Sequence, residues 1–150
     1  MQHSSPLCPA RTPLKKLLAL VGLLAVVGCG SGEPFDYVKV SGKVSYEDGM
    51  LIDADRVTVV FIPLDAPATE GSKPRSGMAE VNVSDGTFDS ATSHRYGDGI
   101  LAGRHRVLIV ALGARQELGI LPPEYSDSEK TPLEVDTADS PFHFKVKRLQ

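Results

Sequence analysis

Cys29 is the residue whose type and position most directly suggest covalent chemistry in this chain. It follows an apolar run over 17–27, which is itself preceded by a basic stretch that ends at Lys16. A charged stretch, a short apolar segment and a small residue before a cleavage point form the layout of an export signal. The alternative is an uncleaved membrane anchor, but a helix over 17–27 reaches only about 16 Å, against a hydrocarbon core of about 30 Å. The sequence therefore predicts a signal peptide over 1–28.

Residues 26–29, with the sequence Val-Val-Gly-Cys, resemble the lipobox of bacterial lipoproteins. In that family the thiol takes a diacylglyceryl group and the signal peptide is cut before the cysteine, so the resemblance implies lipidation of Cys29. Two or three acyl chains anchor a protein stably where a single chain is marginal. By the family's sorting pattern, Gly30 after the cysteine favours the outer membrane over the inner membrane. We expect 29–36 to be a flexible polar spacer between lipid and domain.

Charge and cysteine content argue against other classes of protein. Cys8 would leave with the signal peptide, so the mature chain would have one thiol and no internal disulfide. The chain has 16 Lys and Arg against 19 Asp and Glu, and the basic stretch of the leader would also be removed. An acidic domain without a basic stripe is a poor candidate for binding nucleic acid. It is equally unsuited to electrostatic adsorption on an anionic membrane.

The histidines of the domain do not have the spacing of a metal site. His94, His105 and His143 form no His-x-His or His-x₃-His pattern, so zinc would need ligands from distant strands. His105 is in phase with Val107 and Ile109, which predicts a semi-buried ring whose hydrogen bonds are satisfied. We expect neither a metal nor another cofactor.

Three Asp-Gly pairs allow two interpretations. Clustered carboxylates bind calcium, but the chain has no Asp-x-Asp-x-Asp loop. A tight turn that needs Asp followed by Gly at positive φ explains each pair more simply. The pairs are Asp48-Gly49, Asp85-Gly86 and Asp98-Gly99.

Residues 94–98 combine an imidazole, a guanidinium, a phenol and a carboxylate within one predicted loop. Loops held by rigid sheets carry many binding residues, and Arg and Tyr are enriched at interface hot spots. In the alternative interpretation Tyr96 packs on the rim of the sandwich, Gly97 and Gly99 serve the turn, and the charged side chains are merely solvated. The candidates for partner contact are His94, Arg95, Tyr96 and Asp98.

Hydrophobic alternation predicts short β-strands separated by turns. Over 38–46, Val and Tyr alternate with Lys and Ser, as in a half-buried strand. The segment 56–62 is apolar on both faces, as expected for a central strand, and Pro63 ends it. A turn at 84–86 suggests that 78–90 form a hairpin. Further strands are predicted over 104–111, 133–135 and 142–147.

These elements predict an all-β domain over 37–150. About seven short strands without an amphipathic helix suit an immunoglobulin-like or transthyretin-like Greek-key β-sandwich. Two stacked sheets bury the alternating residues between them. The predicted core contains Val59, Phe61, Val81, Phe88, Val107, Ile109, Phe142 and Phe144.

Three segments, in order, resemble the carboxypeptidase regulatory-like, or transthyretin-like, β-sandwich domains. The segment 40–49 resembles their opening V-x-G-x-V strand and its turn, 85–88 their D-G-x-F hairpin, and 98–107 their G-x-Y/H-x-V strand. The whole chain resembles small lipoproteins that carry one such domain. The resemblance implies a structural or interaction module, because in carboxypeptidases this domain accompanies the catalytic unit and carries none of its zinc ligands.

We therefore expect a membrane-anchored, exported lipoprotein whose β-sandwich is a non-catalytic interaction or envelope-structural module, with an envelope protein or a glycan as partner. The transthyretin-like hydrolase of purine degradation has a related fold, but its Tyr-Arg-Gly-Ser hallmark is missing from 146–150. The chain also has no Gly-x-Ser-x-Gly elbow, so no enzyme activity is expected. The alternative is a small-ligand or carbohydrate-binding lipoprotein that uses loops at one end of the sandwich.

Overall fold

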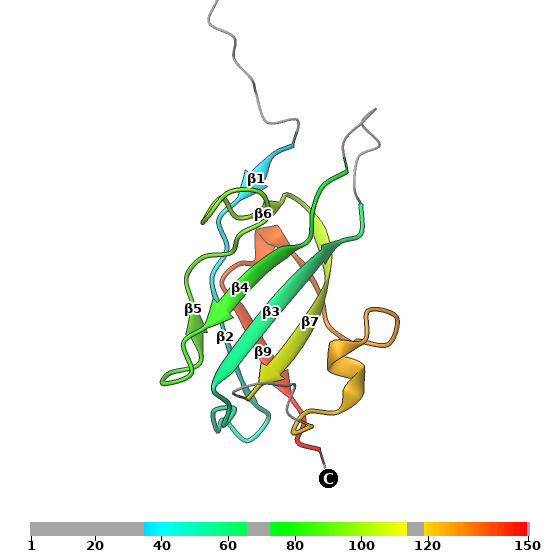
Figure 1. The fold of residues 1–150 in the computed structure, drawn as a ribbon. Helices are drawn as coiled ribbons and strands as arrows, with labels where there is room; N and C mark the ends of the chain where they lie inside the picture. Colours follow the sequence, from blue (N-terminus) through cyan, green and yellow to red (C-terminus); the bar gives the residue numbers. More distant parts are fainter. Residues whose placement is uncertain (1–34, 66–72, 114–118, 150) are drawn as a thin grey trace, which may run out of the picture. The chain divides into compact units, whose positions relative to one another are not determined.

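The computed structural model describes residues 35–65, 73–113 and 119–149, which belong to one compact unit, Glu33–Gln150. These residues form nine β-strands in three sheets, and no α-helix occurs among them (Figure 1). The predicted all-β fold class is confirmed, and the arrangement is consistent with a β-sandwich. The strands are β1 (Tyr37–Val38), β2 (Gly42–Tyr46), β3 (Arg56–Pro63), β4 (Gly77–Val81), β5 (Thr87–Phe88), β6 (Ile100–Leu101), β7 (Arg104–Leu112), β8 (Glu134–Asp136) and β9 (Phe142–Val146).

The larger sheet has four strands in the order β4-β3-β7-β8, and all its pairs are antiparallel. β3 lies in the middle, as its two apolar faces predicted. It pairs with β7 from Arg56 opposite Leu112 to Pro63 opposite His105. The two long strands are rich in β-branched residues, which fit a pleated surface well. This sheet forms the face that is nearest to the viewer in Figure 1.

The smaller sheets join parts of the chain that are far apart in sequence. The three-stranded sheet has the order β5-β2-β9, and β2 pairs parallel with β9 from Gly42 opposite Phe142 to Tyr46 opposite Val146. Parallel neighbours need a long connection, and here it includes most of the domain. β1 and β6 form a separate ladder in which Tyr37 lies opposite Leu101.

The predicted single strand over 38–46 is wrong, because the chain changes sheets within it. β1 pairs with β6, whereas β2 pairs with β5 and β9. Val40, Val44 and Tyr46 are all buried. The alternation therefore identified the inward face correctly but could not show the break at 39–41.

The predicted hairpin over 78–90 is also wrong, because β4 and β5 belong to different sheets. The Asn82 N–H donates to the Thr87 carbonyl at 2.7 Å, which closes the turn. Beyond it, β5 pairs with β2 instead of β4. The turn is a corner between the two sheets, and it directs Phe88 into the core as predicted.

The folded part begins slightly before the predicted boundary at residue 37. Phe35 is buried and its ring meets that of Tyr37 edge-on, with centroids 6.5 Å apart. The Asp36 carbonyl accepts a hydrogen bond from the Ala102 N–H at 2.9 Å. Residues 35 and 36 therefore belong to the domain rather than to the predicted spacer over 29–36.

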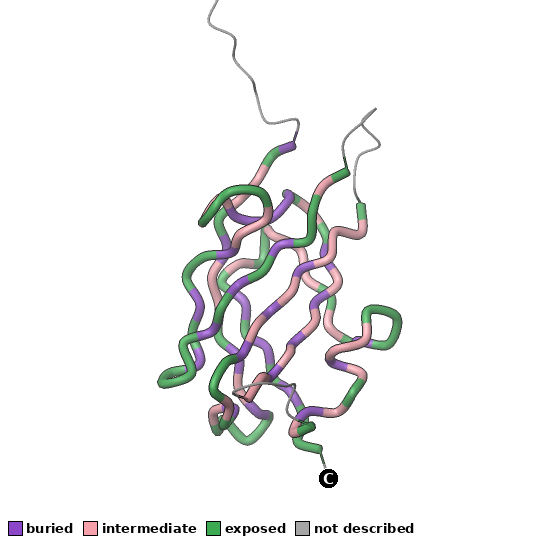
Figure 2. The backbone as a smooth tube through the Cα atoms, viewed as in Figure 1, coloured by how far each residue is buried: buried purple, intermediate pink, exposed green. Residues whose placement is uncertain are grey.

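The core lies between the four-stranded and three-stranded sheets, and all eight residues predicted for it are buried. Burial alternates along the strands, as Figure 2 shows. Phe61 is fully buried at the centre. Its ring centroid lies 6.1 Å from that of Phe88, 5.9 Å from that of Phe142 and 6.3 Å from that of Phe144. This aromatic cluster joins strands from both sheets.

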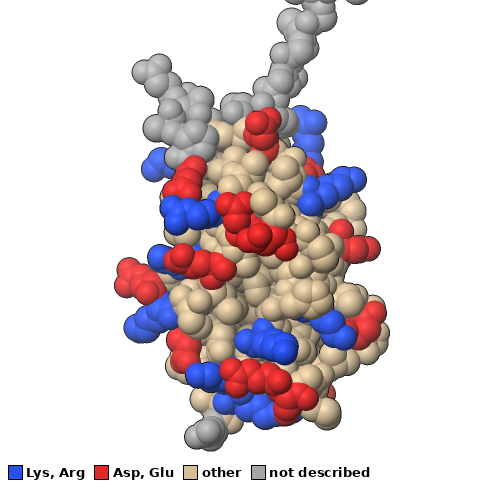
Figure 3. All heavy atoms as spheres, turned by 180° about the vertical axis from the view of Figure 1, so that it is seen from behind, with Lys and Arg blue, Asp and Glu red and all other residues tan. Residues whose placement is uncertain are grey.

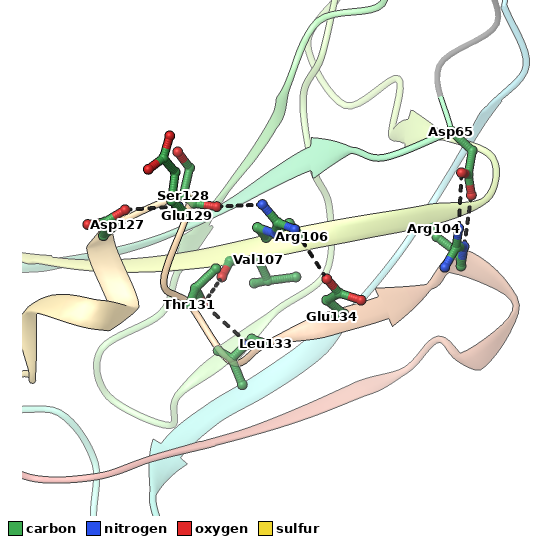
Figure 4. Close-up of polar contacts among 10 residues, drawn as sticks. All are labelled: Asp65, Arg104, Arg106, Val107, Asp127, Ser128, Glu129, Thr131, Leu133 and Glu134. Carbon is green, nitrogen blue, oxygen red and sulfur yellow. Dashed lines mark hydrogen bonds and ion pairs between the residues drawn. The ribbon is translucent and has the colours of Figure 1, made fainter.

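One side of the sandwich is closed by the segment between β7 and β8, which contains the 3₁₀-helix η2 (Pro123–Ser126). Tyr125 is buried, and its hydroxyl accepts a hydrogen bond from the Lys147 N–H at 3.2 Å. The Thr131 hydroxyl donates to the Val107 carbonyl at 2.7 Å. Arg106 donates to the Ser128 carbonyl at 2.8 Å (Figure 4). These bonds hold the segment against the edge of β7, next to the part of β7 that pairs with β8.

Candidate interaction site

The loop over 92–99 is organised by one carboxylate, that of Asp98. Asp98 accepts hydrogen bonds from the backbone N–H groups of Ser93, His94 and Arg95, at 2.8, 2.9 and 2.8 Å. The Gly97 N–H donates to the Thr92 hydroxyl at 3.0 Å. The loop is therefore held by side-chain bonds from within, which gives it a defined shape.

The electrostatic state of Asp98 follows from these bonds. Burial acts to raise the pKa of this carboxyl, but the N–H donors of Ser93, Arg95 and His94 stabilise its ionised form. The net result is a pKa below the ordinary value of 3.8. Asp98 is thus ionised at neutral pH and acts as the acceptor around which the loop is built.

Two glycines give the loop its path. Gly97 and Gly99 have φ values of 70° and 102°, a region that side chains disfavour. A Cβ on Gly99 would also collide with the Val38 carbonyl. The expectation that both glycines serve the turn is confirmed.

Tyr96 is at the tip of this loop and is 96% exposed. The alternative expectation, that it packs on the rim of the sandwich, is therefore wrong. His94 and Arg95 are also exposed, and Asp98 is half-buried beneath them. The structure brings the four predicted residues together in one loop, with Asp98 as the internal support and the other three at the surface.

A groove of about 460 Å³ lies beside Tyr96, between this loop and β4. Its lining combines polar and apolar groups and carries both charges. It includes Arg56, Thr58, Met78, Glu80, Asp89 and Tyr96. Sequence reasoning missed the contributions of β3 and β4, because they become neighbours of the loop only when Met78 pairs with Thr92.

The Asp-Gly pairs behave as turns. Asp48 accepts from the Met50 N–H at 2.9 Å, and Asp85 accepts from both the N–H and the hydroxyl of Thr87 at 2.8 and 2.7 Å. These bonds hold the pKa of both carboxyls below the ordinary value. The partner glycines have positive φ. The turn interpretation is confirmed, and each carboxylate serves its own backbone.

His105 is more deeply buried than predicted, with 1% of its surface exposed. Its Nδ1 lies 3.1 Å from the Gly103 carbonyl, and its ring meets that of Phe61 edge-on. Burial lowers the pKa of His105 below the ordinary value of 6.5. The ring is a packed core residue, as its phase with Val107 and Ile109 suggested. Among the described residues, no three His, Cys, Asp or Glu side chains could together hold a metal ion.

Cys29 and the predicted signal peptide over 1–28 lie outside the described residues. Within 35–65, 73–113 and 119–149, no helix is long and apolar enough to cross a membrane. Comparisons with protein-family models, with curated proteins and with solved structures find no match to this chain.

Proposed function

We propose that this protein is an exported lipoprotein, anchored through Cys29, whose β-sandwich binds an envelope partner through the loop over 92–99 and has no catalytic role. The observation that carries the binding role is Tyr96, a ring that is 96% exposed on a loop fixed by Asp98. A large side chain on a rigid loop can be buried by a partner with little loss of conformational entropy. Aromatic anchors of this kind dominate the binding energy of interfaces.

The anchor is supported by the residues around Cys29. The lipobox-like segment 26–29 follows an apolar run that is too short to span a bilayer. Packing of the domain begins at Phe35, so only 30–34 separate it from the proposed lipid. Even fully extended, such a spacer reaches at most about 20 Å, which would keep the sandwich close to the membrane surface. Gly30 favours the outer membrane.

The non-catalytic assignment is supported by how the reactive side chains are used. The carboxylates of Asp48, Asp85 and Asp98 are all acceptors for their own turns. His105 is enclosed in the core. The resemblance to carboxypeptidase regulatory-like domains points the same way, toward a module that accompanies other proteins.

The anchor is tested by Cys29→Ser in the full-length chain. Because the thiol is the proposed acceptor of the lipid, we expect loss of metabolic palmitate labelling and retention of the uncleaved leader. Cys8→Ser is the matched control, since Cys8 lies within the proposed signal peptide and should be dispensable. Normal labelling and membrane fractionation of Cys29→Ser would refute the anchor.

The binding role is tested by placing a photo-crosslinking amino acid at position 96 of the full-length protein in cells. We expect a discrete crosslinked partner that is absent when the same group replaces Lys145, which is exposed on β9. Tyr96→Ala should lose the partner in a pull-down and keep its melting temperature. Equal crosslinking from positions 96 and 145 would show that the loop over 92–99 is not the site that binds the partner.

A second function is favoured by the groove beside Tyr96. An exposed aromatic ring next to Arg56, Glu80 and Asp89 suits a glycan, which stacks its ring on an aromatic face and bonds its hydroxyls to polar groups. A saturating glycan at 100 times its Kd would stabilise the domain by about 2.7 kcal/mol, which a thermal-shift assay detects. A shift that disappears in Tyr96→Ala would favour this function over a protein partner.

A further inference from the structure

The outer face of the four-stranded sheet is unusually apolar. We call it the aliphatic face, and all of its members are partly or largely exposed. They are Val60, Ile62, Met78, Leu108, Val110 and Leu112. Thr58, which lies between Glu80 and Val110, is a polar position on the same side of the sheet. The register places Val60 between Met78 and Leu108, so the side chains form a continuous surface over β4, β3 and β7. In Figure 2 this face points toward the viewer.

A sandwich does not need such a face to fold, because its core is already built on the inner sides of the sheets. Outward positions of sandwich strands are normally polar. A contiguous exposed apolar patch of a few hundred Å² is often functional. The outer face of β2 and β9 behaves normally: Figure 3, which is seen from behind, shows acidic and basic side chains spread over the opposite side.

The aliphatic face has an Arg–Glu pair at each of two opposite corners. At one corner, Nε of Arg56 on β3 lies 3.3 Å from Oε1 of Glu80 on β4. At the other corner, Nη2 of Arg106 on β7 lies 3.5 Å from Oε1 of Glu134 on β8 (Figure 4). The register puts Arg56 at the level of Leu112 and Arg106 at the level of Ile62, which are opposite ends of the sheet. The apolar side chains run between these two corners.

The two corners are arranged so that they match each other when a second copy is turned over onto the face. With strands about 4.8 Å apart and a rise of about 3.4 Å per residue, Glu80 and Arg106 both lie about 8–10 Å from the centre of the face. Arg56 and Glu134 both lie about 10–13 Å from it, on the same spacings. Consider a two-fold axis that lies in the plane of the face and runs along the apolar side chains. Rotation about this axis places Arg56 over Glu134 and Glu80 over Arg106, so positions of opposite charge meet.

We propose that the aliphatic face is the interface of a two-fold symmetric dimer of this chain. Arg56 faces Glu134 of the partner subunit, and Glu80 faces Arg106 of the partner subunit. A two-fold contact of this kind uses the same patch on both copies, which requires the patch to be self-complementary in shape and charge. A flat sheet face with these two corners meets both requirements. The dimer goes beyond the function proposed above, and because Arg56, Met78 and Glu80 also line the groove beside Tyr96, it would cover part of that groove.

The dimer is expected to be weak. Three strand widths by about seven residues give roughly 350 Å² per copy, below the approximately 800 Å² typical of a stable interface. We expect a weak, transient contact and take a dissociation constant of about 100 μM as the value to test. If the lipid anchor is also present, confinement to one membrane surface raises the effective concentration and increases the dimer fraction.

The test uses sedimentation velocity of residues 33–150, because every member of the buried core lies between Val40 and Val146 and the unit contains its whole core. The first variant reverses one corner, Arg56→Glu with Glu80→Arg, and the second reverses the other, Arg106→Glu with Glu134→Arg. Each keeps an ion pair of opposite charges within its own chain. Each should self-associate at least about tenfold more weakly than wild type, because like charges then face each other across the interface.

The decisive measurement is the mixture of the two variants. Opposite charges face each other again in the mixed dimer, so the mixture should associate with about wild-type affinity although neither variant does so alone. Lys145→Glu on the opposite face is the control and should associate like wild type. Should Arg106→Glu unfold the domain, Glu134→Arg mixed with Arg56→Glu replaces the pair.

Three results would overturn the proposal. The first is a wild-type domain that stays monomeric at about 1 mM, ten times the expected dissociation constant. The second is association that neither corner reversal weakens. The third is a mixture that fails to recover the affinity of wild type. None of these measurements involves Cys29, so their outcome is separate from that of the anchor. Arg106 and Glu134 do not line the groove beside Tyr96, so the reversal of that corner tests the dimer separately from the site at the loop.

Discussion

On the outer face of β2 and β9, the residues that alternate with the core include Lys43, Ser45 and Lys145. At the corresponding outward positions of β3 and β7 the chain instead has aliphatic residues such as Val60 and Leu108. The inward faces of both sheets are equally buried. Because the pleat separates the two sides of each strand, folding determines only the inner side. Folding therefore does not determine which side chains occupy the outer side. In this protein they are polar on β2 and β9 and mostly aliphatic on β3 and β7.

The largest expected effect on the free energy of unfolding comes from comparing two neighbouring residues of β3, one on each side of the strand. Phe61→Ala removes the centre of the aromatic cluster and should cost roughly 3–5 kcal/mol of unfolding free energy. Val60→Thr, one residue away on the aliphatic face, should cost less than about 1 kcal/mol. Denaturant titration of residues 33–150 at low concentration measures both. Equal losses would show that the aliphatic face is packed within a single copy.

The loop over 92–99 gives an intermediate effect that involves neither face. Asp98→Asn removes the charge that three N–H groups contact and should destabilise the domain by about 1–3 kcal/mol at neutral pH. Asp89→Asn is the matched control, since this exposed carboxylate lines the groove beside Tyr96 and accepts none of the three backbone hydrogen bonds that Asp98 accepts.

The loss in Asp98→Asn should also depend on pH. The folded-state pKa of Asp98 lies below 3.8, so its contribution is complete above that value and is lost as pH falls through the lowered pKa. Wild type and Asp98→Asn should therefore converge in stability in strong acid. A difference that stays constant down to that range would assign the effect to packing rather than to charge.

The smallest expected effect compares one substitution on each face. Leu108→Thr should change the stability of the dilute monomer by less than about 1 kcal/mol and should weaken self-association. Lys145→Thr on the opposite face should change neither quantity measurably. Sedimentation and denaturation on the same samples make the comparison. A Lys145→Thr variant that associates less would shift the interface to the other sheet.

Sequence reasoning succeeded where the information is local. The alternation of Phe142 and Phe144 with Lys145 identifies the inward side of β9, and the Asp98-Gly99 pair identifies a turn. It failed where the outcome depends on partners distant in sequence. The corner at 84–86 has the residues of a hairpin, and only the pairing of Phe88 with Gly42 shows that it joins two sheets.

The aliphatic face escaped sequence reasoning for a related reason. Val60 and Ile62, between inward-facing residues of β3, indicated a strand covered on both sides. β3 is indeed central within its sheet, but hydrogen-bonded neighbours protect the edges of a strand and not its outer face. Tyr96 was ambiguous because exposure of a single aromatic residue has no periodic signal. Its burial could be settled only by the course of the loop.

The parallel pairing of β2 with β9 has a consequence for how the domain acquires its structure. The Ser41 N–H bonds to the Ser140 hydroxyl at 3.1 Å across 99 positions of the chain. A contact between residues so far apart in the chain closes a large loop. Folding is slowed because the chain loses the entropy of loop closure before the new contacts stabilise it. Until 142–146 arrive, β2 has only its short contact with β5, and the aromatic cluster around Phe61 lacks two of its rings. For a chain delivered from its N-terminus, the hydrophobic core is therefore completed by its last strand.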